Sequence, residues 1–283
     1  MRILITGAAG MLGNDVRIAA ERNGHETVAL ARADLDVSDG QAVSAAVAEA
    51  APDVVVNCAA WTDVDGAEAH YDAALAVNGT GAGNVGRAAA AAGAWTVHVS
   101  TDYVFDGTHT TPYMESDEPA PVSGYGRSKL AGELELAAAA PRHQTIVRTS
   151  WLFGLSGSSF PKTILKLARE RDELKVVDDQ VGCPTFTGHL GAALVTLAAG
   201  PRPAGVLHLA ASGQCSWCAF AREIVAGSGA QCRVSPCSTA EFPRPAPRPA
   251  YSVLRSERGD APPALPHWRE GLAEFLAGVE VPA

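Results

Sequence analysis

The sequence predicts an α/β fold: a doubly wound parallel sheet with a smaller α/β lobe beside it. Three observations support this. Short apolar strands such as 2–6 and 53–57 alternate with helical patterns, a glycine-rich turn follows the first strand, and the alternation becomes less regular after residue 149. Regular alternation of strands and helices builds parallel sheets, which bind ligands at the carboxyl ends of their strands.

The composition is that of a globular protein. The 283 residues are enough for one large or two modest domains. The net charge is −9 with no run of Lys or Arg, which argues against sequence-independent binding to nucleic acid or to an anionic membrane. No apolar run reaches about 18 residues, and the chain starts without a signal-peptide pattern. We therefore expect a cytoplasmic protein without a membrane partner.

The six cysteines are expected to stay reduced in such a compartment. A zinc site is the alternative for four of them, namely Cys215, Cys218, Cys232 and Cys237. The spacing of the second pair is looser than in a typical zinc ribbon. Trp217 and Phe220 fit an amphipathic helix with Ser216 as its N-cap. We expect no metal, and one equivalent of zinc in the purified protein would contradict this.

The first strand (2–6) leads into the spacing G-x-x-G-x-x-G and then a helical pattern. This arrangement is typical of a Rossmann-type dinucleotide site. Gly7 allows a tight turn, Gly10 lets the backbone approach a pyrophosphate, and Gly13 lets the helix pack closely on the strand. The free N–H groups of the helix then face the phosphates. A turn without a ligand is the alternative. The predicted cofactor contacts here are Gly7, Gly10, Met11, Leu12 and Gly13.

The second strand (26–30) indicates which dinucleotide is bound. An NAD-preferring site usually has an acid at this strand end, but here Ala31 and Arg32 follow. An arginine can bind a 2′-phosphate, so we predict NADPH, with NADH as the alternative. In the next turn Asp36, with Val37 beside it, is a candidate contact for the adenine. The alternative role of Asp36 is to cap the helix expected over 41–50.

The next two strands end in further candidate contacts. The buried strand 53–57 is followed by Ala59, Ala60 and Trp61, and small residues there let a flat cofactor cross the sheet edge. A long helix is expected over 67–93. The strand 95–100 then ends in Thr101 and Asp102.

Tyr125 and Lys129 lie four residues apart in the helix expected to run to about residue 140. This spacing places both side chains on one helix face. A tyrosine with a pKa near 10 is a poor acid–base catalyst, and a neighbouring ammonium lowers that pKa. The alternative is a solvated helix face. The second half of the chain is expected to contain a strand at 144–149, helices near 160–171, 188–199 and 217–227, strands near 174–177 and 205–209, and an extended proline-rich segment at 241–249.

Taken together, these motifs resemble the extended short-chain dehydrogenase/reductase family and, more narrowly, the dTDP-4-dehydrorhamnose reductase family. The resemblance runs nearly end to end. It is carried by Asp-Val-Val-Val-Asn-Cys-Ala-Ala-Trp-Thr-Asp-Val-Asp at 53–65, Ser-Thr-Asp-Tyr-Val-Phe-Asp-Gly at 100–107, Tyr-Gly-Arg-Ser-Lys-Leu-Ala-Gly-Glu at 125–133, Arg-Thr-Ser-Trp at 148–151, Asp-Gln-Val-Gly-Cys-Pro-Thr at 179–185 and Arg-Pro-Ala-Tyr-Ser at 248–252.

The resemblance implies reduction of the C4 ketone of a dTDP-linked 4-keto-6-deoxy sugar, dTDP-4-dehydro-L-rhamnose to dTDP-L-rhamnose. By this resemblance Tyr125 gives a proton to the forming alkoxide. Lys129 lowers the pKa of Tyr125 and holds the nicotinamide ribose, and Thr101 hydrogen-bonds the ketone oxygen. Prepositioned donors of this kind act mainly in the transition state.

The resemblance also implies substrate contacts from Asp102, Trp151 and Arg248. The alternative for Trp151 is that it packs in the core. The alternative for Arg248 is that it is a solvated cation in a loop. We predict a cofactor-binding Rossmann domain over 1–149, joined by about 176–200. The sugar-nucleotide lobe is then expected from about 150–175 and 201–283, with the active site in the cleft between the two.

The chain also departs from the family pattern. Members of the family can dimerise through magnesium held by glutamates, but here Phe186-Thr-Gly188 stands where a glutamate is expected, and only Asp15 lies near an equivalent acidic position. We therefore predict a monomer. Trp61 replaces a usual histidine or tyrosine, so another dTDP-4-keto sugar, from an antibiotic or dihydrostreptose-type pathway, is the alternative substrate.

Two other functions are considered. An epimerase or dehydratase of the same superfamily is one, but dehydratases usually carry an Asp-Glu pair where this chain has Asp102-Tyr103. A non-catalytic regulatory subunit that keeps the fold is the other. The intact set of Thr101, Tyr125 and Lys129 argues against it.

Overall fold

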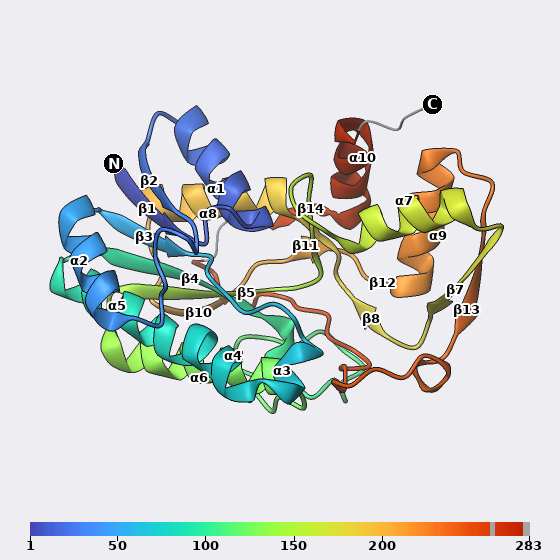
Figure 1. The fold of residues 1–283 in the computed structure, drawn as a ribbon, viewed down its shortest axis with the longest axis horizontal. Helices are drawn as coiled ribbons and strands as arrows, with labels where there is room; N and C mark the ends of the chain where they lie inside the picture. Colours follow the sequence, from blue (N-terminus) through green and yellow to red (C-terminus); the bar gives the residue numbers. More distant parts are fainter. Residues whose placement is uncertain (261–263, 280–283) are drawn as a thin grey trace.

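The computed structural model describes residues 1–260 and 264–279. Its largest element is a six-stranded parallel sheet in the order β10-β5-β4-β3-β1-β2 (Figure 1). The strands are β1 (Arg2–Thr6), β2 (Glu26–Leu30), β3 (Val54–Asn57), β4 (Trp95–Thr101), β5 (Gln144–Thr149) and β10 (Gly205–His208). The strand order reverses between β1 and β3, and such a switch point is where doubly wound sheets bind ligands. The predicted fold class is confirmed.

Helices cover both faces of this sheet (Figure 1). They are α1 (Met11–Arg22) and α8 (Thr187–Ala199) on one face, and α2 (Gly40–Ala50), α5 (Gly81–Ala91) and α6 (Gly124–Ala139) on the other. Because side chains alternate along a strand, Val54 and Val56 pack in the core under α1 and α8, whereas Val55 packs in the core with α2 and α5. Within the described residues, no helix is both long and apolar enough to cross a membrane.

The prediction of a single long helix over 67–93 is wrong. The segment is instead α3 (Gly66–Ala69), α4 (Tyr71–Leu75), a π-helical turn (Ala76–Thr80) and then α5. The π turn contains Asn78, whose Oδ1 accepts from Trp61 N at 2.8 Å and whose Nδ2 donates to Trp61 O at 3.1 Å. The wider turn thus presents Asn78 to the loop that follows β3, and π turns of this kind are common near functional sites.

A second lobe lies on the right of Figure 1, with its own hydrophobic core around Phe153, Phe220 and Phe275. Its larger elements are α7 (Phe160–Glu170), β7 (Glu173–Val177), α9 (Trp217–Ser228), β13 (Arg233–Cys237) and α10 (Trp268–Gly278). Strands β7 and β13 pair in parallel. The short elements are η2 (Asp102–Val104), β6 (Leu152–Phe153), β8 (Val181–Gly182), β9 (Thr185–Phe186), β11 (Ala211–Ser212), β12 (Cys215–Ser216), η3 (Thr239–Glu241) and β14 (Leu265–His267).

The structure corrects the predicted assignment of segments to the two lobes. The strand expected at 205–209 was placed in the sugar-nucleotide lobe, but β10 pairs in parallel with β5 of the large sheet. The segment expected to rejoin the first domain, 176–200, is itself divided. Helix α8 packs against α1, whereas β7 pairs with β13. The reason is topological, because α8 covers the sheet and the chain then crosses back to add an edge strand.

The four cysteines considered as zinc ligands lie in this second lobe, at β12, α9 and β13. Ser216 caps α9 as predicted, with its Oγ accepting from Ala219 N at 3.0 Å. Cys218 is buried on the same helix, and burial raises the pKa of Cys215 to about 12. In the described part of the chain, no three His, Cys, Asp or Glu side chains are grouped so that they could hold a metal ion.

Candidate active site

A cavity of about 770 Å³ lies at the carboxyl edge of the large sheet. Every residue predicted to bind the cofactor lines it: Gly7, Gly10, Met11, Leu12, Gly13, Arg32, Asp36, Val37, Ala59, Ala60, Trp61, Tyr125 and Lys129. Thr101, Asp102 and Trp151 line the same cavity. The structure therefore brings together predicted site residues as far apart in the chain as Gly7 and Trp151.

The glycine turn at this edge fits a dinucleotide. Gly7 has a φ of +65°, and a Cβ built on it would lie 2.7 Å from Ala59 N. A Cβ on Gly13 would lie 2.3 Å from Gly7 O. Helix α1 begins at Met11, and its N-cap, Gly10, provides no side-chain hydrogen bond; the first turn contains no acidic residue. Its first N–H groups are therefore free to bind phosphate oxygens, which is the donor set a pyrophosphate needs.

Arg32 and Asp36 lie where the cavity wall passes the end of β2. Asp36 accepts hydrogen bonds from Ser38 N at 2.9 Å and Ser38 Oγ at 2.7 Å, and these bonds lower its pKa. The alternative role for Asp36, capping the next helix, is wrong. Asp39 is the N-cap of α2, because its Oδ1 accepts from Gln41 N at 2.9 Å.

Thr101 and Asp102 stand at the end of β4. The Thr101 hydroxyl donates to Asp102 Oδ1 at 3.0 Å and accepts from Tyr103 N at 3.2 Å. Asp102 is only 2% exposed, and among the described residues its Oδ2 has no hydrogen-bond partner. Burial raises the pKa of Asp102 to about 7, so this carboxyl is half protonated near neutral pH. A buried acid beside Thr101 is thus available to contact a polar ligand.

The expected lowering of the Tyr125 pKa is wrong. Burial raises the pKa of Tyr125 to about 12, and the Thr101 hydroxyl opposes this only in part. The ammonium of Lys129 does not reverse the direction, because Lys129 Nζ donates to Val99 O at 2.7 Å and lies 3.4 Å from His98 Nε2. Burial also lowers the pKa of Lys129, to about 8. Tyr125 is therefore a neutral phenol at pH 7, ready to donate its proton.

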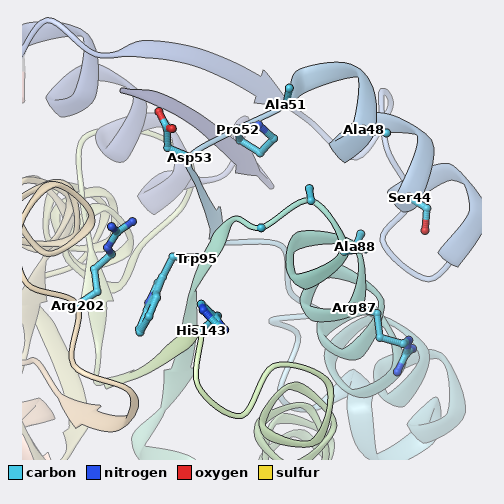
Figure 2. Close-up of a pocket in the computed structure, with 13 residues that line it drawn as sticks. Ser44, Ala48, Ala51, Pro52, Asp53, Arg87, Ala88, Trp95, His143 and Arg202 are labelled. Carbon is cyan, nitrogen blue, oxygen red and sulfur yellow. The ribbon is translucent and has the colours of Figure 1, made fainter.

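A second cavity, of about 980 Å³, lies at the opposite edge of the sheet (Figure 2). Asp53, Trp95 and His143 line it, and each stands at the start of a strand or just before one. None of the predicted site residues lies there. Size alone therefore does not mark the site.

Comparison with known proteins agrees with this geometry. A family model described as "RmlD substrate binding domain" matches residues 1–281. The chain belongs to this family. The match spans nearly the whole sequence and confirms the resemblance drawn from the motifs.

Several relatives of this chain carry functional names. A dTDP-4-dehydrorhamnose reductase of Streptomyces griseus is 44% identical over 280 residues, covering 96% of this chain and 92% of that protein. A probable dTDP-4,6-dihydroxy-2-methyloxan-3-one 4-ketoreductase of Streptomyces antibioticus is 41% identical over 288 residues, covering 99% and 96%. A dTDP-4-dehydrorhamnose reductase of Bacillus anthracis, solved in complex with NADP, is 37% identical and superposes with a TM-score of 0.95, covering 98% and 99%.

Trp217 is a site residue that the sequence analysis missed. The sequence indicated only that it fits an amphipathic helix, but it lines the cavity and stacks on Trp151 with ring centroids 3.5 Å apart and planes 5° apart. Trp151 has a φ of +46°, which is strained for a bulky residue. Both tryptophans line the cavity, and Trp217 also packs against the core of the second lobe. The stack joins the segment that follows β5 to α9 of the second lobe.

Arg248 does not line the cavity. Its two guanidinium nitrogens pair with the two carboxylate oxygens of Asp65, each at 3.0 Å, and this bond lowers the pKa of Asp65. Arg244 also approaches Asp65, at 3.6 Å. Arg248 is thus not a solvated loop cation. Its predicted contact with the substrate diphosphate stays a prediction.

Two further residues in this RmlD family member had a weak signal in the sequence. Asn78 is a lone amide in a run of Ala, Val and Gly, and His98 is a lone imidazole in an apolar strand. Both are buried, and their polar atoms bond to groups beside the cavity. An isolated polar residue in an apolar element is the signal that could have found them, because burying one without a partner is costly.

Proposed function

We propose that this protein reduces the C4 ketone of a dTDP-linked 4-keto-6-deoxy sugar, converting dTDP-4-dehydro-L-rhamnose to dTDP-L-rhamnose with NADPH. The observation that carries the proposal is one continuous cavity. It joins the glycine turn, suited to a pyrophosphate, to Thr101, Tyr125 and Lys129. Relatives at 41–44% identity are named as reductases of the same kind of ketone, which supports this chemistry.

The protein's own residues have separable tasks in this reaction. Bound NADPH supplies the hydride. Thr101 holds the ketone oxygen near Tyr125, and Tyr125, a neutral phenol, donates its proton to that oxygen. Lys129 provides positive charge beside the phenol and binds the nicotinamide ribose. The N–H groups of α1 hold the pyrophosphate, and Arg32 holds the 2′-phosphate.

Two neighbouring substrate contacts complete the proposal. Asp102 and Trp151 line the cavity on the substrate side, next to Thr101. The segment carrying Arg248 lies against Asp65, and we propose that Arg248 also reaches the diphosphate of the sugar nucleotide. The sugar then lies between the Rossmann domain and the second lobe, as small-molecule sites between domains often do.

Incubation of purified protein with dTDP-4-keto-6-deoxy-L-mannose and either NADPH or NADH tests the reaction. We expect a loss of absorbance from the reduced nicotinamide and one new sugar nucleotide of L-rhamno configuration. No turnover with any dTDP-4-keto sugar would exclude the reductase function. Retention of a tightly bound cofactor with no need for external reductant would instead indicate an epimerase.

A second substrate is favoured by one feature, Trp61. Its backbone N–H is held by Asn78 and its ring lines the cavity. This large side chain reshapes the pocket relative to the usual histidine or tyrosine. The Streptomyces antibioticus relative, by its printed name, acts on a different dTDP-linked ketone. Competition between the two dTDP-sugars in one assay, compared by kcat/KM, decides between them.

We also propose that the protein is a monomer. Asp15 is half-buried, and the Thr187 hydroxyl, which lies in the segment where the family's glutamate is expected, donates to Phe153 O at 3.2 Å. A single carboxylate is a poor magnesium site. Sedimentation at equal protein concentration, with and without Mg²⁺, should give the same monomer mass; a magnesium-dependent dimer would contradict this.

A further inference from the structure

A ladder of polar side chains crosses three neighbouring strands of an otherwise apolar sheet. Thr6 in β1 is in register with Asn57 in β3, and Asn57 is in register with His98 in β4. All three are buried, with exposed fractions of 1%, 2% and 0%. The ladder ends at Lys129 of α6, whose Nζ lies 3.4 Å from His98 Nε2. Because leaving a buried polar group unpaired is unfavourable, donors and acceptors along this ladder should match.

The backbone determines how the Asn57 amide is oriented. Asn57 Oδ1 accepts from Ala59 N at 3.2 Å and from Thr6 Oγ1 at 2.7 Å. A backbone N–H can only donate, so the amide oxygen faces Ala59 and the amide nitrogen faces His98. That nitrogen lies 3.0 Å from His98 Nδ1 and donates to it. His98 Nδ1 is therefore an acceptor without a proton.

His98 is consequently the neutral tautomer with its proton on Nε2. Burial lowers the pKa of His98 well below its usual range, so the ring carries a single N–H. This N–H points at Lys129 Nζ. An ammonium has three donors and no acceptor, so it cannot hydrogen-bond to Nε2–H. An unprotonated amine can accept that bond with its lone pair, and it still donates to Val99 O at 2.7 Å.

We propose that His98 is a positioning residue that donates from Nε2 to the unprotonated amine of Lys129, and so lets Lys129 alternate between ammonium and amine inside the site. In each turnover Tyr125 loses one proton to the ketone oxygen, and a proton from the Lys129 ammonium replaces it. The amine is then reprotonated from the bulk solvent, which supplies the one proton that each reduction consumes, and His98 neither gains nor loses a proton. The inference goes beyond the proposed function, in which Lys129 is a fixed cation, and rests on it only for placing Lys129 in the site.

The other groups around Lys129 do not provide this bond. Glu133, one turn along α6, raises the pKa of Lys129, but its carboxylate is already held by Arg148 at 2.7 Å. Cys58, at the end of β3, acts in the same direction, yet burial raises its own pKa to about 12 and leaves it a neutral thiol. Tyr125, one turn back, is a neutral phenol. A thiol and a phenol can also donate, but among the described residues the hydrogen-bond contacts of Lys129 Nζ are those with Val99 O and His98 Nε2.

Nitrogen NMR of the histidine rings tests the tautomer in the whole protein without any ligand. Protonated and unprotonated ring nitrogens give separate signals in ¹⁵N-histidine protein. His98 is assigned by the signals lost in His98→Gln or, should that variant not fold, by through-bond correlation. We expect a proton on Nε2, none on Nδ1, and no titration from about pH 6 to 9. A proton on Nδ1, or a ring that titrates in this range, would overturn the proposal.

Asn57→Asp tests the coupling to Lys129. The new carboxylate accepts from Nδ1–H, so Nε2 becomes an acceptor and favours the ammonium. We expect the pH midpoint for acylation of Lys129, followed by mass spectrometry, to rise by about one unit or more, with the ring proton moving to Nδ1. The exposed Lys166 and Lys175 are internal references. A rise in the midpoint without a change of tautomer would come from charge alone and would contradict the proposal.

His98→Gln is the matched control, because its amide NH₂ can still donate toward Lys129. We expect its Lys129 midpoint to stay within about 0.3 unit of wild type. A shift as large as that of Asn57→Asp would contradict the inference. None of these measurements needs turnover. If no dTDP-4-keto sugar is reduced but the ring carries Nε2–H, the proposed function fails and this inference stands. In an active enzyme, the alkaline limb of the kcat profile moves with the midpoint while KM is unchanged.

Discussion

The two edges of the large sheet both carry a cavity, yet only one has the features of an active site. The two cavities are of comparable size, about 980 Å³ at the amino edge (Figure 2) and about 770 Å³ at the carboxyl edge. At the amino edge, polar groups bond to neighbours: Asp53 accepts from Arg2 N at 2.7 Å, and Trp95 Nε1 donates to Thr145 at 3.0 Å. At the carboxyl edge, the buried side chains of Asp102 and Lys129 line one cavity together with Tyr125.

This difference teaches that an active site is marked by titratable groups that converge on one cavity more than by volume. Polar groups held ready at the carboxyl edge lower the stability of the fold, and they persist because the surrounding structure holds them in place. At the amino edge, local bonds already use the same kinds of residue. Substitutions at matched positions on the two edges can therefore break or sharpen the comparison.

The largest effect is expected from Tyr125→Phe. Removing the proton donor should lower kcat by about 10²–10⁴-fold, since general acid catalysis contributes on this scale. NADPH affinity, followed by tryptophan fluorescence, should stay near wild type. His143→Phe, at the amino edge, is the control and should change kcat by less than about twofold. A wild-type rate in Tyr125→Phe would remove Tyr125 as the proton donor.

A matched pair of glycines gives the next largest effect. Gly7 and Gly93 both have left-handed φ values, +65° and +72°, but a Cβ on Gly7 meets Ala59 N at 2.7 Å, whereas a Cβ on Gly93 meets nothing within 4 Å. In both alanine variants, backbone strain should lower the free energy of unfolding by about 1 kcal/mol. In Gly7→Ala, overpacking should lower it by about 1–3 kcal/mol more.

Urea unfolding and NADPH titration measure the two glycine variants. We expect Gly7→Ala also to weaken NADPH binding about tenfold or more, which corresponds to at least about 1.4 kcal/mol. Equal losses of stability in the two variants, with cofactor affinity unchanged in both, would show that close packing at the glycine turn is not required.

Arg248→Ala distinguishes a substrate contact from a purely structural ion pair. If Arg248 reaches the diphosphate, KM for the sugar nucleotide should rise about tenfold while NADPH affinity is unchanged, as expected for loss of one charge-assisted contact. Arg244→Ala is the control, because Arg244 faces the same Asp65 but is about half exposed. Lower stability with an unaltered KM would assign Arg248 to the Asp65 pair alone.

The smallest effect is expected from Arg32→Ala. Loss of the cation beside the 2′-phosphate should weaken NADPH about five- to tenfold and NADH less than twofold. Arg87→Ala, in the amino-edge cavity, should leave both affinities unchanged. Equal weakening of the two cofactors by Arg32→Ala would remove the argument for NADPH preference.

Much of the site could be predicted because its residues follow strand ends. The glycine turn after β1, Arg32 after β2, Ala59–Trp61 after β3 and Thr101 at the end of β4 are local features. A parallel sheet necessarily collects the carboxyl ends of its strands at one edge. The spacing of Tyr125 and Lys129 is likewise local, since a helix places positions i and i+4 together.

Other features depend on contacts between distant segments. The amide of Asn78, in the π turn, binds Trp61, which is 17 residues away. The edge strand β10 depends on the path that the chain takes after α8, which brings it beside β5. The raised pKa of Tyr125 follows from how deeply the packed fold buries it. The Asp65–Arg248 pair links residues 183 positions apart.

By itself, then, the sequence determined the fold class, the edge of the sheet where the predicted site residues gather, and the placement of Tyr125 and Lys129 on one helix, because each depends on period or spacing within one element. Only the tertiary structure decided which tautomer His98 adopts, where Trp217 faces and what Arg248 binds. Donor–acceptor matching and burial are properties of side chains brought together from separate elements, and no local pattern specifies them.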